Sequence, residues 1–581
     1  MKINSKSSKL LSFLCLFIIL ILLFGGLFIY FNALYEIFTN GFGGSFDDAY
    51  MFTRYSQNLL NGYGFTWNAG MSSTYGPTSI PYVFIVTLFM RFVPLESNFL
   101  MPTISWIIGL MVLALLGNAA LTQTRKLSLP IATVALGCVA WVAISPFFIY
   151  HATTGMDTTF SMLANTLLAL AWIKLSDKRG VKRAFILALT AYLSFAIRPD
   201  NIIYAFGFPV LALLVIESPS QWREALLFLG FFSGLIIADT FLKIRIFGDP
   251  LPLSYYVKQH NFYQGYLGES KWNPITYLSI FIIGVIPSGI VLLSSLRRIH
   301  TKLAVAFLAP VALTFAYYFS VLQIMGQYAR YYYPASPFVI ILSILVMRDL
   351  NTLPAWAEFK KASWRLILSI LSLISVLLFL TTTGQNLYSV YVFGAPTLSG
   401  EEAAANSPGS NIQKLGWGRA ILAITPLIKQ LPNGTIIAAS EVGYIGAKAS
   451  QVEIIDMIGL NDPIIAHNGF NATELLARKP DLIWMPHADY ALIRLNIECN
   501  PDLYAKYTYY PNFFDYGIAV RKNGQHTNSI TNLLSESLES VYPNLKVPLD
   551  DLAKNELPAY CIVSNIPTSD PNIISHPTRL P

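Results

Sequence analysis

The chain has 581 residues, of which 54% are hydrophobic and only 12% are charged, with a mean hydropathy of +0.51. Soluble domains carry about 25% charged residues, so this composition excludes a soluble globular protein. The apolar residues fall in runs about as long as a bilayer crossing requires. The sequence therefore predicts a polytopic α-helical membrane protein. The net charge of +7 is distributed as membrane insertion requires, and nothing indicates a nucleic-acid partner.

The first apolar run follows the basic segment MKINSKSSK. It is too long for a signal-peptide core and lacks a small-residue cleavage site, so we expect a retained span. The apolar stretch 79–93 is short and opens with prolines, which favours an interfacial or re-entrant helix over a full span. About eleven spans are predicted, near 10–30, 102–121, 129–149, 156–174, 183–197, 201–216, 226–246, 275–296, 303–321, 335–348 and 366–382.

Lysine and arginine are concentrated in alternate connecting segments, which predicts the topology. With the N-terminus in the cytoplasm, the inner segments carry most of these residues and the outer ones far fewer. The loop 31–101 and everything after about residue 382 then lie outside, in the periplasm of a bacterium. We therefore expect an inner (plasma) membrane protein with a transmembrane module over 1–384 and a periplasmic domain over 385–581.

The C-terminal region changes in character, because Pro, Asn, Asp and Ser become frequent and long apolar runs stop. The segments TIIAAS and DLIWMP are typical of buried strands, and TELLARK is typical of a helix. Such alternation predicts a small α/β domain. The chain from about residue 540 is rich in Pro, Asn and Ser and is expected to be loose.

Four cysteines are too few for a disulfide scaffold. Cys15 and Cys138 fall in predicted spans, where small core residues are ordinary. Cys499 and Cys561 both fall in the C-terminal region. If that region lies outside the cytoplasm, these two can pair.

Asp47 and Asp48 stand in the first outer loop, close to the end of the first span. A carboxylate near hydrocarbon must be solvated, paired or functional. The following Arg54 and Tyr55 belong to a helical pattern typical of a helix on the membrane surface. An alternative explanation is that the acids cap this helix, and Asp48 is the better placed to do so at a helix starting near Ala49.

Further polar segments fall at the same predicted membrane face: HATTGMD ending at Asp157, Arg198-Pro-Asp200, GDPLPLSYYVK with Tyr255, Tyr256 and Lys258, and QYARYYYP with Arg330. Aromatic belts, snorkelling cations and helix caps can explain each singly. Together they combine cations that can hold a phosphate with carboxylates that can deprotonate a hydroxyl. That combination suits a lipid-phosphate substrate.

In this order the motifs resemble those of the C-type polyprenyl-phosphate-dependent glycosyltransferases. They resemble in particular those of the group containing the mycobacterial terminal β-(1→2) arabinofuranosyltransferase. The shared elements are a DDAY-type motif, an RYxxNLxxGxGxxxN pattern beginning at Arg54, and TGMD, RPD and GDPLPxxYYxK motifs. Asp157 stands where Glu is more usual, and Ser72-Ser73-Thr74 replaces an acidic residue of the family.

The resemblance implies an inverting transfer of a sugar from a polyprenyl-phosphate donor to a glycan or lipid acceptor of the cell envelope. Asp47 or Asp48 would be the general base, with Asp47 favoured, and Asp157 would support the acceptor or a metal. Arg198, Lys258 and Arg330 would stabilise the phosphate, with Arg54, Tyr55, Asp200, Tyr255 and Tyr256 in the substrate site. Some relatives use Mg²⁺ or Mn²⁺, which Asp47 and Asp48 could ligate.

Two other functions are compatible with the pattern. A transporter or flippase for lipid-linked sugars would also bind polyprenyl phosphate in a helical bundle. Its ionisable residues should be spread through the membrane depth, often around internal repeats, whereas these gather at one face. A non-catalytic scaffold that presents the C-terminal domain would leave the acids and bases unexplained.

Overall fold

The computed structural model describes most of residues 24–35 and then residues 46–125, 129–217, 222–259, 273–295, 301–321, 323, 326–350, 417–542, 548–559 and 561. The chain divides into two compact units that each draw on distant parts of the sequence. We call them the helical unit (1–43, 98–239 and 270–392) and the sheet unit (44–97, 240–269 and 393–581).

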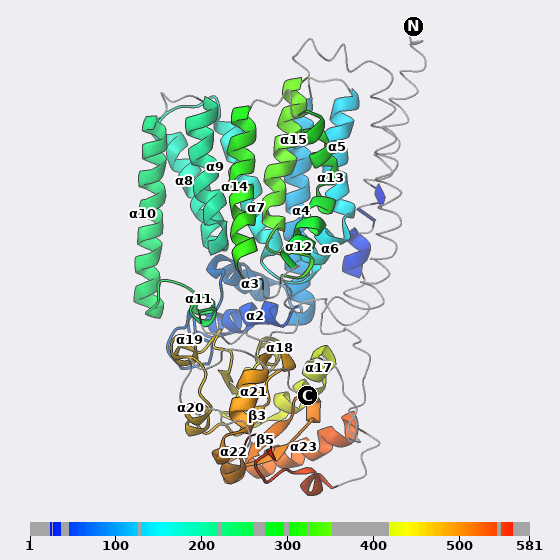
Figure 1. Cartoon of the computed structure of the whole chain (residues 1–581), viewed down its shortest axis with the longest axis vertical. Coiled ribbons are helices and arrows are strands. Elements are labelled where there is room, and N and C mark those ends of the chain that lie inside the picture. The colour runs from blue at the N-terminus through cyan, green and yellow to red at the C-terminus, as the bar shows by residue number, and fades with distance from the viewer. Residues whose placement is uncertain are drawn as a thin grey trace. The chain divides into compact units, whose positions relative to one another are not determined.

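Long apolar helices make up the helical unit, and most of them run side by side in a bundle (Figure 1). Tight pairs include α7 with α8 and α9 with α14, whose facing side chains are buried. The described helices are α4 (Ser97–Thr124), α5 (Leu129–Ile144), α6 (Pro146–Thr153), α7 (Thr158–Leu175), α8 (Val181–Ile197), α9 (Ile202–Leu211), α10 (Trp222–Phe247), α12 (Asn273–Gly284), α13 (Ile286–Ser294), α14 (Thr301–Ser320) and α15 (Ser336–Leu350).

Six of the described helices are long and apolar enough to cross a membrane, or up to eight if each of two bent pairs is one span. Both pairs bend where a proline opens the second helix, by 56° before Pro146 and by 80° near Pro287. Proline suits the first turn of a helix but cannot donate the hydrogen bond that would continue a preceding one. The protein is a multi-pass membrane protein.

Each predicted span that falls on described residues coincides with a helix or a bent pair. The helix α8 has 17 residues, one fewer than the shortest of the six helices counted as long enough to cross a membrane. The predicted span 366–382 and most of 10–30 lie outside the described residues. The count of about eleven spans and the orientation therefore stay predictions.

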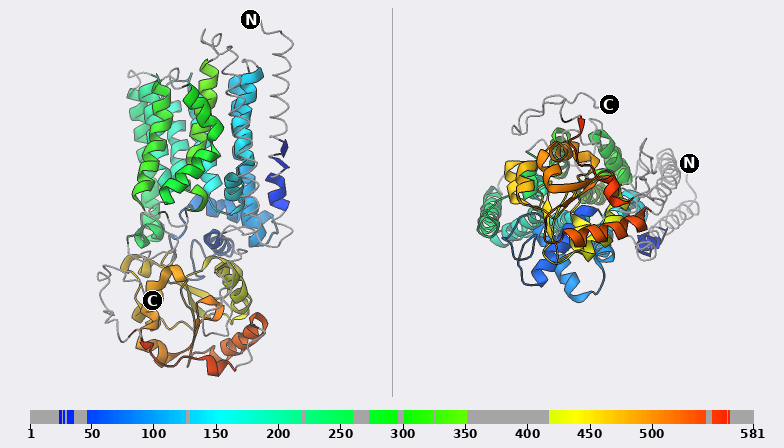
Figure 2. Two further views of the ribbon diagram at one scale, coloured as in Figure 1. Left: turned by 45° about the vertical axis from the view of Figure 1, so that its right-hand side comes forward. Right: turned by 90° about the horizontal axis from the view of Figure 1, so that it is seen from below.

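A five-stranded mixed sheet forms the centre of the sheet unit (Figure 2). Its strands follow the order β2-β1-β3-β5-β4, with β1 parallel to β2 and β3, and β5 antiparallel to β3 and β4. Nearly all strand residues are buried, as expected of a sheet with helices packed against it. The strands are β1 (Ile436–Ala439), β2 (Glu453–Asp456), β3 (Leu482–Trp484), β4 (Tyr507–Tyr510) and β5 (Ile518–Arg521).

The segments expected to be strands and helix at TIIAAS, DLIWMP and TELLARK are β1, β3 and part of α20, so the prediction of a small α/β fold is confirmed. The helices of this region are α17 (Trp417–Gln430), α18 (Gly443–Lys448), α19 (Pro463–Asn468), α20 (Ala472–Ala477), α21 (Ala491–Glu498), α22 (Pro501–Lys506) and α23 (Thr527–Val541).

Two helices from the loop after the first predicted span also belong to the sheet unit. They are α2 (Asp47–Leu60) and α3 (Ile80–Phe92), which pack on each other. The segment 240–269, with α11 (Leu253–Val257), is a further part of this unit. The compact units thus divide the chain differently from the expected boundary near residue 384.

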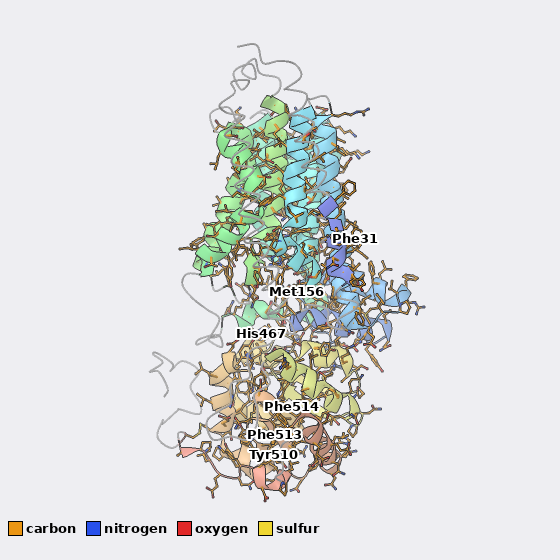
Figure 3. The ribbon with its side chains drawn as sticks, turned by 90° about the vertical axis from the view of Figure 1, so that its right-hand side faces the viewer. Phe31, Met156, His467, Tyr510, Phe513 and Phe514 are labelled. Carbon is orange, nitrogen blue, oxygen red and sulfur yellow. A yellow bond between two sulfur atoms is a disulfide. The ribbon has the colours of Figure 1, made fainter. Side chains whose placement is uncertain are left out.

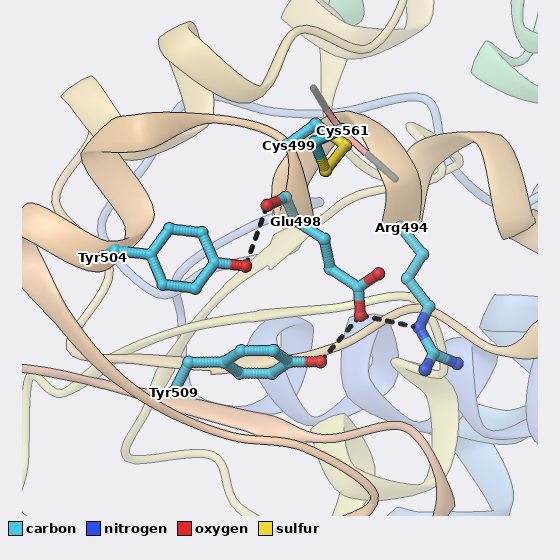
Figure 4. Close-up of a disulfide and its surroundings, with 6 residues drawn as sticks. All are labelled: Arg494, Glu498, Cys499, Tyr504, Tyr509 and Cys561. Atoms are coloured by element: carbon cyan, nitrogen blue, oxygen red, sulfur yellow. Dashed lines mark hydrogen bonds and ion pairs between the residues drawn. A yellow bond between two sulfur atoms is a disulfide. The ribbon is translucent and has the colours of Figure 1, made fainter. Parts of the chain in front are cut away.

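A disulfide joins Cys499, at the end of α21, to Cys561 in the last described segment (Figure 4). Beside it, the Glu498 carboxylate accepts hydrogen bonds from the Tyr509 hydroxyl and from Arg494 Nε. The backbone N–H of Lys554 also donates to the Tyr509 carbonyl. The expected pairing is present, and the described part of the tail beyond residue 540 is held at two points.

We expect Cys499 and Cys561 to resist thiol labelling until the protein is reduced. A disulfide that closes a long loop typically contributes about 2–4 kcal/mol, so Cys561→Ser should lower the unfolding temperature of the sheet unit. Cys499→Ser should have the same effect, and the double variant no further effect, because both remove one bond. Complete labelling of both cysteines without reductant would contradict the pairing.

Candidate functional site

Asp157 lies between two arginines in the helical unit. One carboxylate oxygen is 3.7 Å from Arg198 Nη1 and 3.6 Å from Arg330 Nη2, and the three side chains are 1%, 6% and 9% exposed. Asp157 precedes α7, Arg198 follows α8 and Arg330 precedes the helices that lead into α15. Because α7 and α8 are consecutive and antiparallel, the group lies at one end of the bundle.

Asp200 completes the charge balance of this cluster. Its carboxylate accepts a bidentate pair of hydrogen bonds from Arg198, at 3.0 Å from Nε and 2.6 Å from Nη2, and a third from the Tyr318 hydroxyl at 2.7 Å. Both guanidinium groups also lie over the ring of Tyr331, at 5.4 and 5.8 Å from its centroid. The structure therefore brings together Asp157, Arg198, Asp200 and Arg330, four of the residues that the sequence singled out.

Several polar atoms of this cluster have no hydrogen-bond partner among the described residues. They are Asp157 Oδ1, Arg198 Nη1, Arg330 Nε and His151 Nδ1. The Nε2 of His151 lies 3.0 Å from the Tyr328 carbonyl, which can only accept, so Nε2 carries the proton and Nδ1 is a free acceptor. Buried polar atoms are normally satisfied. The cluster thus offers both donors and acceptors to a bound molecule.

The backbone before Arg330 is strained. Tyr328 and Ala329 adopt φ values of 51° and 65°, in the left-handed region that non-glycine residues rarely visit. Such conformations persist where surrounding contacts fix them, and they concentrate at functional sites. Here the Tyr328 carbonyl is held by His151, and the strain lies directly beside the arginine whose Nε is unsatisfied.

An amide that the sequence analysis missed joins the two arginine-bearing segments. Asn165 Nδ2 donates to the Pro334 carbonyl at 2.8 Å, and Asn165 Oδ1 accepts from the Ser194 hydroxyl at 2.6 Å. Ser194 is one turn before Arg198, and Pro334 is one turn after Arg330. A buried Asn inside an apolar span was the available signal, since polar residues within spans are rare and tend to be functional or paired.

In the sheet unit, Asp47 binds the start of a helix almost four hundred residues away in the sequence. Its two carboxylate oxygens accept from the backbone N–H groups of Gly443 and Tyr444, at 2.8 and 2.7 Å. Asp47 is only 4% exposed. A Cβ on Gly443 would overlap the Asp47 carbonyl, so this approach of α2 to α18 requires glycine.

Burial raises the pKa of Asp47 to about 7, although the hydrogen bonds from Tyr444 and Gly443 act in the opposite direction. Asp48 is half-buried and lies in the first turn of α2. The expectation that Asp48 caps this helix is wrong, because α2 begins at Asp47 and its N-cap is Phe46. The reason for favouring Asp47 as the base is therefore removed.

Arg54, expected in the substrate site, is instead fully used within the sheet unit. It is 2% exposed, and each of its five N–H groups donates to an oxygen of the protein. Because a guanidinium has five donors, none is left for a substrate. The acceptors are the carbonyls of Trp67, Gly446, Ala449 and Val452 and the side-chain oxygen of Asn68, at 2.7–3.2 Å.

Two other residues of the RYxxNLxxGxGxxxN pattern, Tyr55 and Asn68, also have structural roles. Asn68 accepts from the Ile454 N–H and donates to the Ile454 carbonyl, which pairs the outer edge of β2 as another strand would. The Tyr55 hydroxyl is bonded to Thr74 and Asn461 and is fully buried. Tyr55 was expected to bind substrate, but its hydroxyl is not accessible in this structure.

The segment of Tyr255, Tyr256 and Lys258 forms α11 and its end, also in the sheet unit. Tyr255 and Lys258 are exposed. The ring of Tyr256 packs on His467, labelled in Figure 3, at 4.4 Å, and Asp249 lies 3.0 Å from the Nε2 of that histidine. These contacts join α11 to α19.

No group of three or more His, Cys, Asp or Glu side chains that could hold a metal ion occurs among the described residues. The suggested ligand Asp47 has both oxygens hydrogen-bonded to backbone N–H groups. Each of these bonds uses one of the two acceptor positions of its oxygen. The suggestion that Asp47 and Asp48 ligate Mg²⁺ or Mn²⁺ therefore stays a hypothesis.

Comparison with known proteins gives a domain family of unknown function (DUF8728), whose model matches residues 412–529. No curated protein matches the chain. Among solved structures, it is similar to the Archaeoglobus fulgidus oligosaccharyltransferase, solved in complex with zinc and sulfate. The identity is 14% and the TM-score 0.37, over 81% of this chain and 69% of the other. A similarity this low is no evidence of function.

We expect Asp47→Asn to destabilise the sheet unit, because one oxygen becomes an NH₂ group facing a backbone donor. Loss of a charge-assisted hydrogen bond costs about 1.5–3 kcal/mol. Thermal unfolding should show the loss, and hydrogen exchange should quicken over residues 441–449. Gly443→Ala should act in the same direction. Asp502→Asn, which removes only an exposed i,i+4 ion pair, is the control, and wild-type behaviour of both test variants would contradict the docking role.

Proposed function

We propose that this protein is an inverting glycosyltransferase that moves a sugar from a polyprenyl-phosphate donor to a cell-envelope acceptor. The observation that carries the proposal is the cluster of Asp157, Arg198 and Arg330 at one end of the helical bundle, with donors and acceptors that no described residue satisfies. The motif order described above supports the reaction class.

The arginines are suited to the donor phosphate. Asp157 is 3.6–3.7 Å from each guanidinium, which is too long for good hydrogen bonds. The ion pairs therefore balance the charges while Arg198 Nη1 and Arg330 Nε keep N–H groups for another acceptor. Arginine binds phosphate through such paired donors. Asp157 Oδ1 and His151 Nδ1 are the complementary acceptors for hydroxyl groups of the sugar.

In the proposed reaction, an oxygen of the acceptor hydroxyl attacks the anomeric carbon as the bond from that carbon to the phosphate oxygen breaks. The electron pair leaves with polyprenyl phosphate, whose growing charge the arginines stabilise. The hydroxyl proton passes to a carboxylate. Direct attack from the face opposite the leaving group inverts the anomeric centre.

We assign the proton acceptor to Asp48 and a positioning role to Asp47. Both oxygens of Asp47 are bonded to backbone N–H groups and the residue is nearly inaccessible. Asp48 is adjacent and more accessible. Lys258 and Tyr255, exposed on α11, are the remaining candidates for substrate contacts in the sheet unit, whereas Arg54 and Tyr55 maintain its fold.

A transporter of lipid-linked sugars is the alternative. A transport pathway requires polar groups through the depth of the bundle. The charged cluster of the helical unit lies instead where α7 begins and α8 ends, and the deeper Asn165 and Ser194 are hydrogen-bonded to each other. This arrangement favours a reaction at one membrane surface.

We propose that the N-terminus is cytoplasmic and that the sheet unit lies on the outer face of a bacterial inner membrane. Lysine and arginine are concentrated in the segments that this orientation places inside. Alkaline phosphatase fused at the C-terminus should be active, and green fluorescent protein fused after Arg125 should fluoresce. The reverse result at either position would overturn the orientation.

We expect Arg198→Ala and Arg330→Ala to weaken binding of a polyprenyl phosphate to the purified protein. Loss of one charge-assisted contact costs about 1.5–3 kcal/mol, or roughly 10- to 100-fold in affinity. Direct binding in detergent measures the effect without knowledge of the sugar. Arg348→Ala is the matched control, because it removes a half-buried arginine outside the cluster, bonded to Asp349 and Gln123. Equal affinities in all three variants would show that the clustered arginines serve only the fold.

We expect Asp48→Asn to abolish transfer, because the amide keeps the size of the side chain but cannot accept a proton at neutral pH. A positioned base contributes about 10²–10⁴-fold. Mass spectrometry of surface glycans and lipid-linked sugars, in a deletion strain carrying the variant, measures the loss. Polyprenyl phosphate binding and unfolding temperature should be unchanged. A folded Asp47→Asn variant without transfer, beside an active Asp48→Asn variant, would assign the base to Asp47.

A further inference from the structure

The exposed face of α3 is an apolar feature of the sheet unit that the proposed reaction does not use. Phe84, Leu88 and Phe92 are spaced by four residues and are 56%, 57% and 74% exposed. The spacing places them on one side of the helix. Tyr82, Val83 and Val86 lie on the other side and are fully buried.

The length and composition of α3 determine which environment suits it. It has 13 residues and is about 20 Å long, too short for the ~30 Å hydrocarbon core. It is a single helix without a break. Its one charged residue is Arg91, in the last turn. A solvated helix does not normally present such an apolar face.

The face of α3 continues into the end of a membrane-spanning helix within the same unit. The ring of Phe65 lies 6.1 Å from that of Phe84 and 5.4 Å from that of Phe247, the last residue of α10. Residues 240–247 of α10 belong to the sheet unit. Their exposed apolar side chains are Phe241, Leu242, Ile244 and Ile246.

The depth of this region in a bilayer follows from the length of α10. Its 26 residues extend about 39 Å, beyond the ~30 Å hydrocarbon core. The last turns therefore reach the headgroups, and they carry Lys243 and Arg245. Lys243 Nζ lies 5.3 Å from the centroid of the Tyr75 ring, and that ring stacks on Phe247. Cations and aromatic rings of this kind mark the membrane boundary.

We propose that the Phe84–Leu88–Phe92 face of α3 is a membrane-binding surface, which lies at the boundary between lipid headgroups and acyl chains. The occupant of this face is the bilayer rather than a second protein, because the face adjoins, through Phe65, the exposed apolar end of α10. Arg91 at its end is placed to contact the phosphates of anionic lipids. The surface would keep the loop that carries α2 at the bilayer.

Spin labels on the full chain in nanodiscs of phosphatidylcholine and phosphatidylglycerol test this surface. Single cysteines replace Phe84, Leu88 or Phe92 in a Cys15→Ser, Cys138→Ser background that keeps the disulfide. A label at Ile237, exposed on α10, is the acyl-chain reference, and a label at Glu474, exposed on α20, is the aqueous reference.

At the three positions of α3, collisions with oxygen should exceed those with the water-soluble nickel reagent NiEDDA, as at Ile237 and opposite to Glu474. Access to NiEDDA equal to that at Glu474 would overturn the proposal. Spin–spin broadening that disappears on dilution with unlabelled protein would also overturn it, because a second copy would then cover the face. The readout requires no transferase activity, so it stands apart from the proposed function.

Discussion

The buried guanidinium of Arg54 is the interaction on which the sheet unit depends. Burying a cation is costly unless its hydrogen-bonding groups are satisfied, and all five donors of Arg54 are. Burial lowers its pKa to about 10, so it remains charged at neutral pH. Its acceptors lie in the loop that contains α2, in α18 and in the segment that links α18 to β2. The loop and the C-terminal region therefore fold as one body.

Asp47 and Asn68 also join the loop that contains α2 to the C-terminal region, through hydrogen bonds to α18 and to the edge strand β2. Asp47 fixes the start of α18, and Asn68 satisfies the backbone of β2 that would otherwise be an open strand edge. Such an edge exposes unpaired N–H and C=O groups that invite association with other strands. Because Asp48 is adjacent to Asp47, docking of α18 also fixes the carboxylate to which we assign proton transfer.

The arginines of the two units differ in how many of their N–H groups are hydrogen-bonded. Arg54 has no donor left, whereas Arg198 Nη1 and Arg330 Nε have no hydrogen-bond partner among the described residues. In a helical bundle, a buried charge without full satisfaction is expensive and is retained where it is needed for function. The strained backbone at Tyr328 and Ala329, next to Arg330, is consistent with this distinction. A structural arginine differs from a candidate ligand-binding one in whether all its N–H groups are hydrogen-bonded within the protein, and not in its charge.

The sequence by itself determined the membrane class, the position of each described span and the strands β1 and β3. Hydrophobicity and its period are local properties that need only neighbouring residues to be read. It also brought Asp157, Arg198, Asp200 and Arg330 into one hypothesis, because their segments fall at the same ends of consecutive spans. The tertiary structure alone showed which groups Asp47, Arg54 and Tyr55 contact, since these partners lie about four hundred residues away. No local pattern distinguishes a carboxylate that accepts a substrate proton from one that accepts two backbone N–H groups.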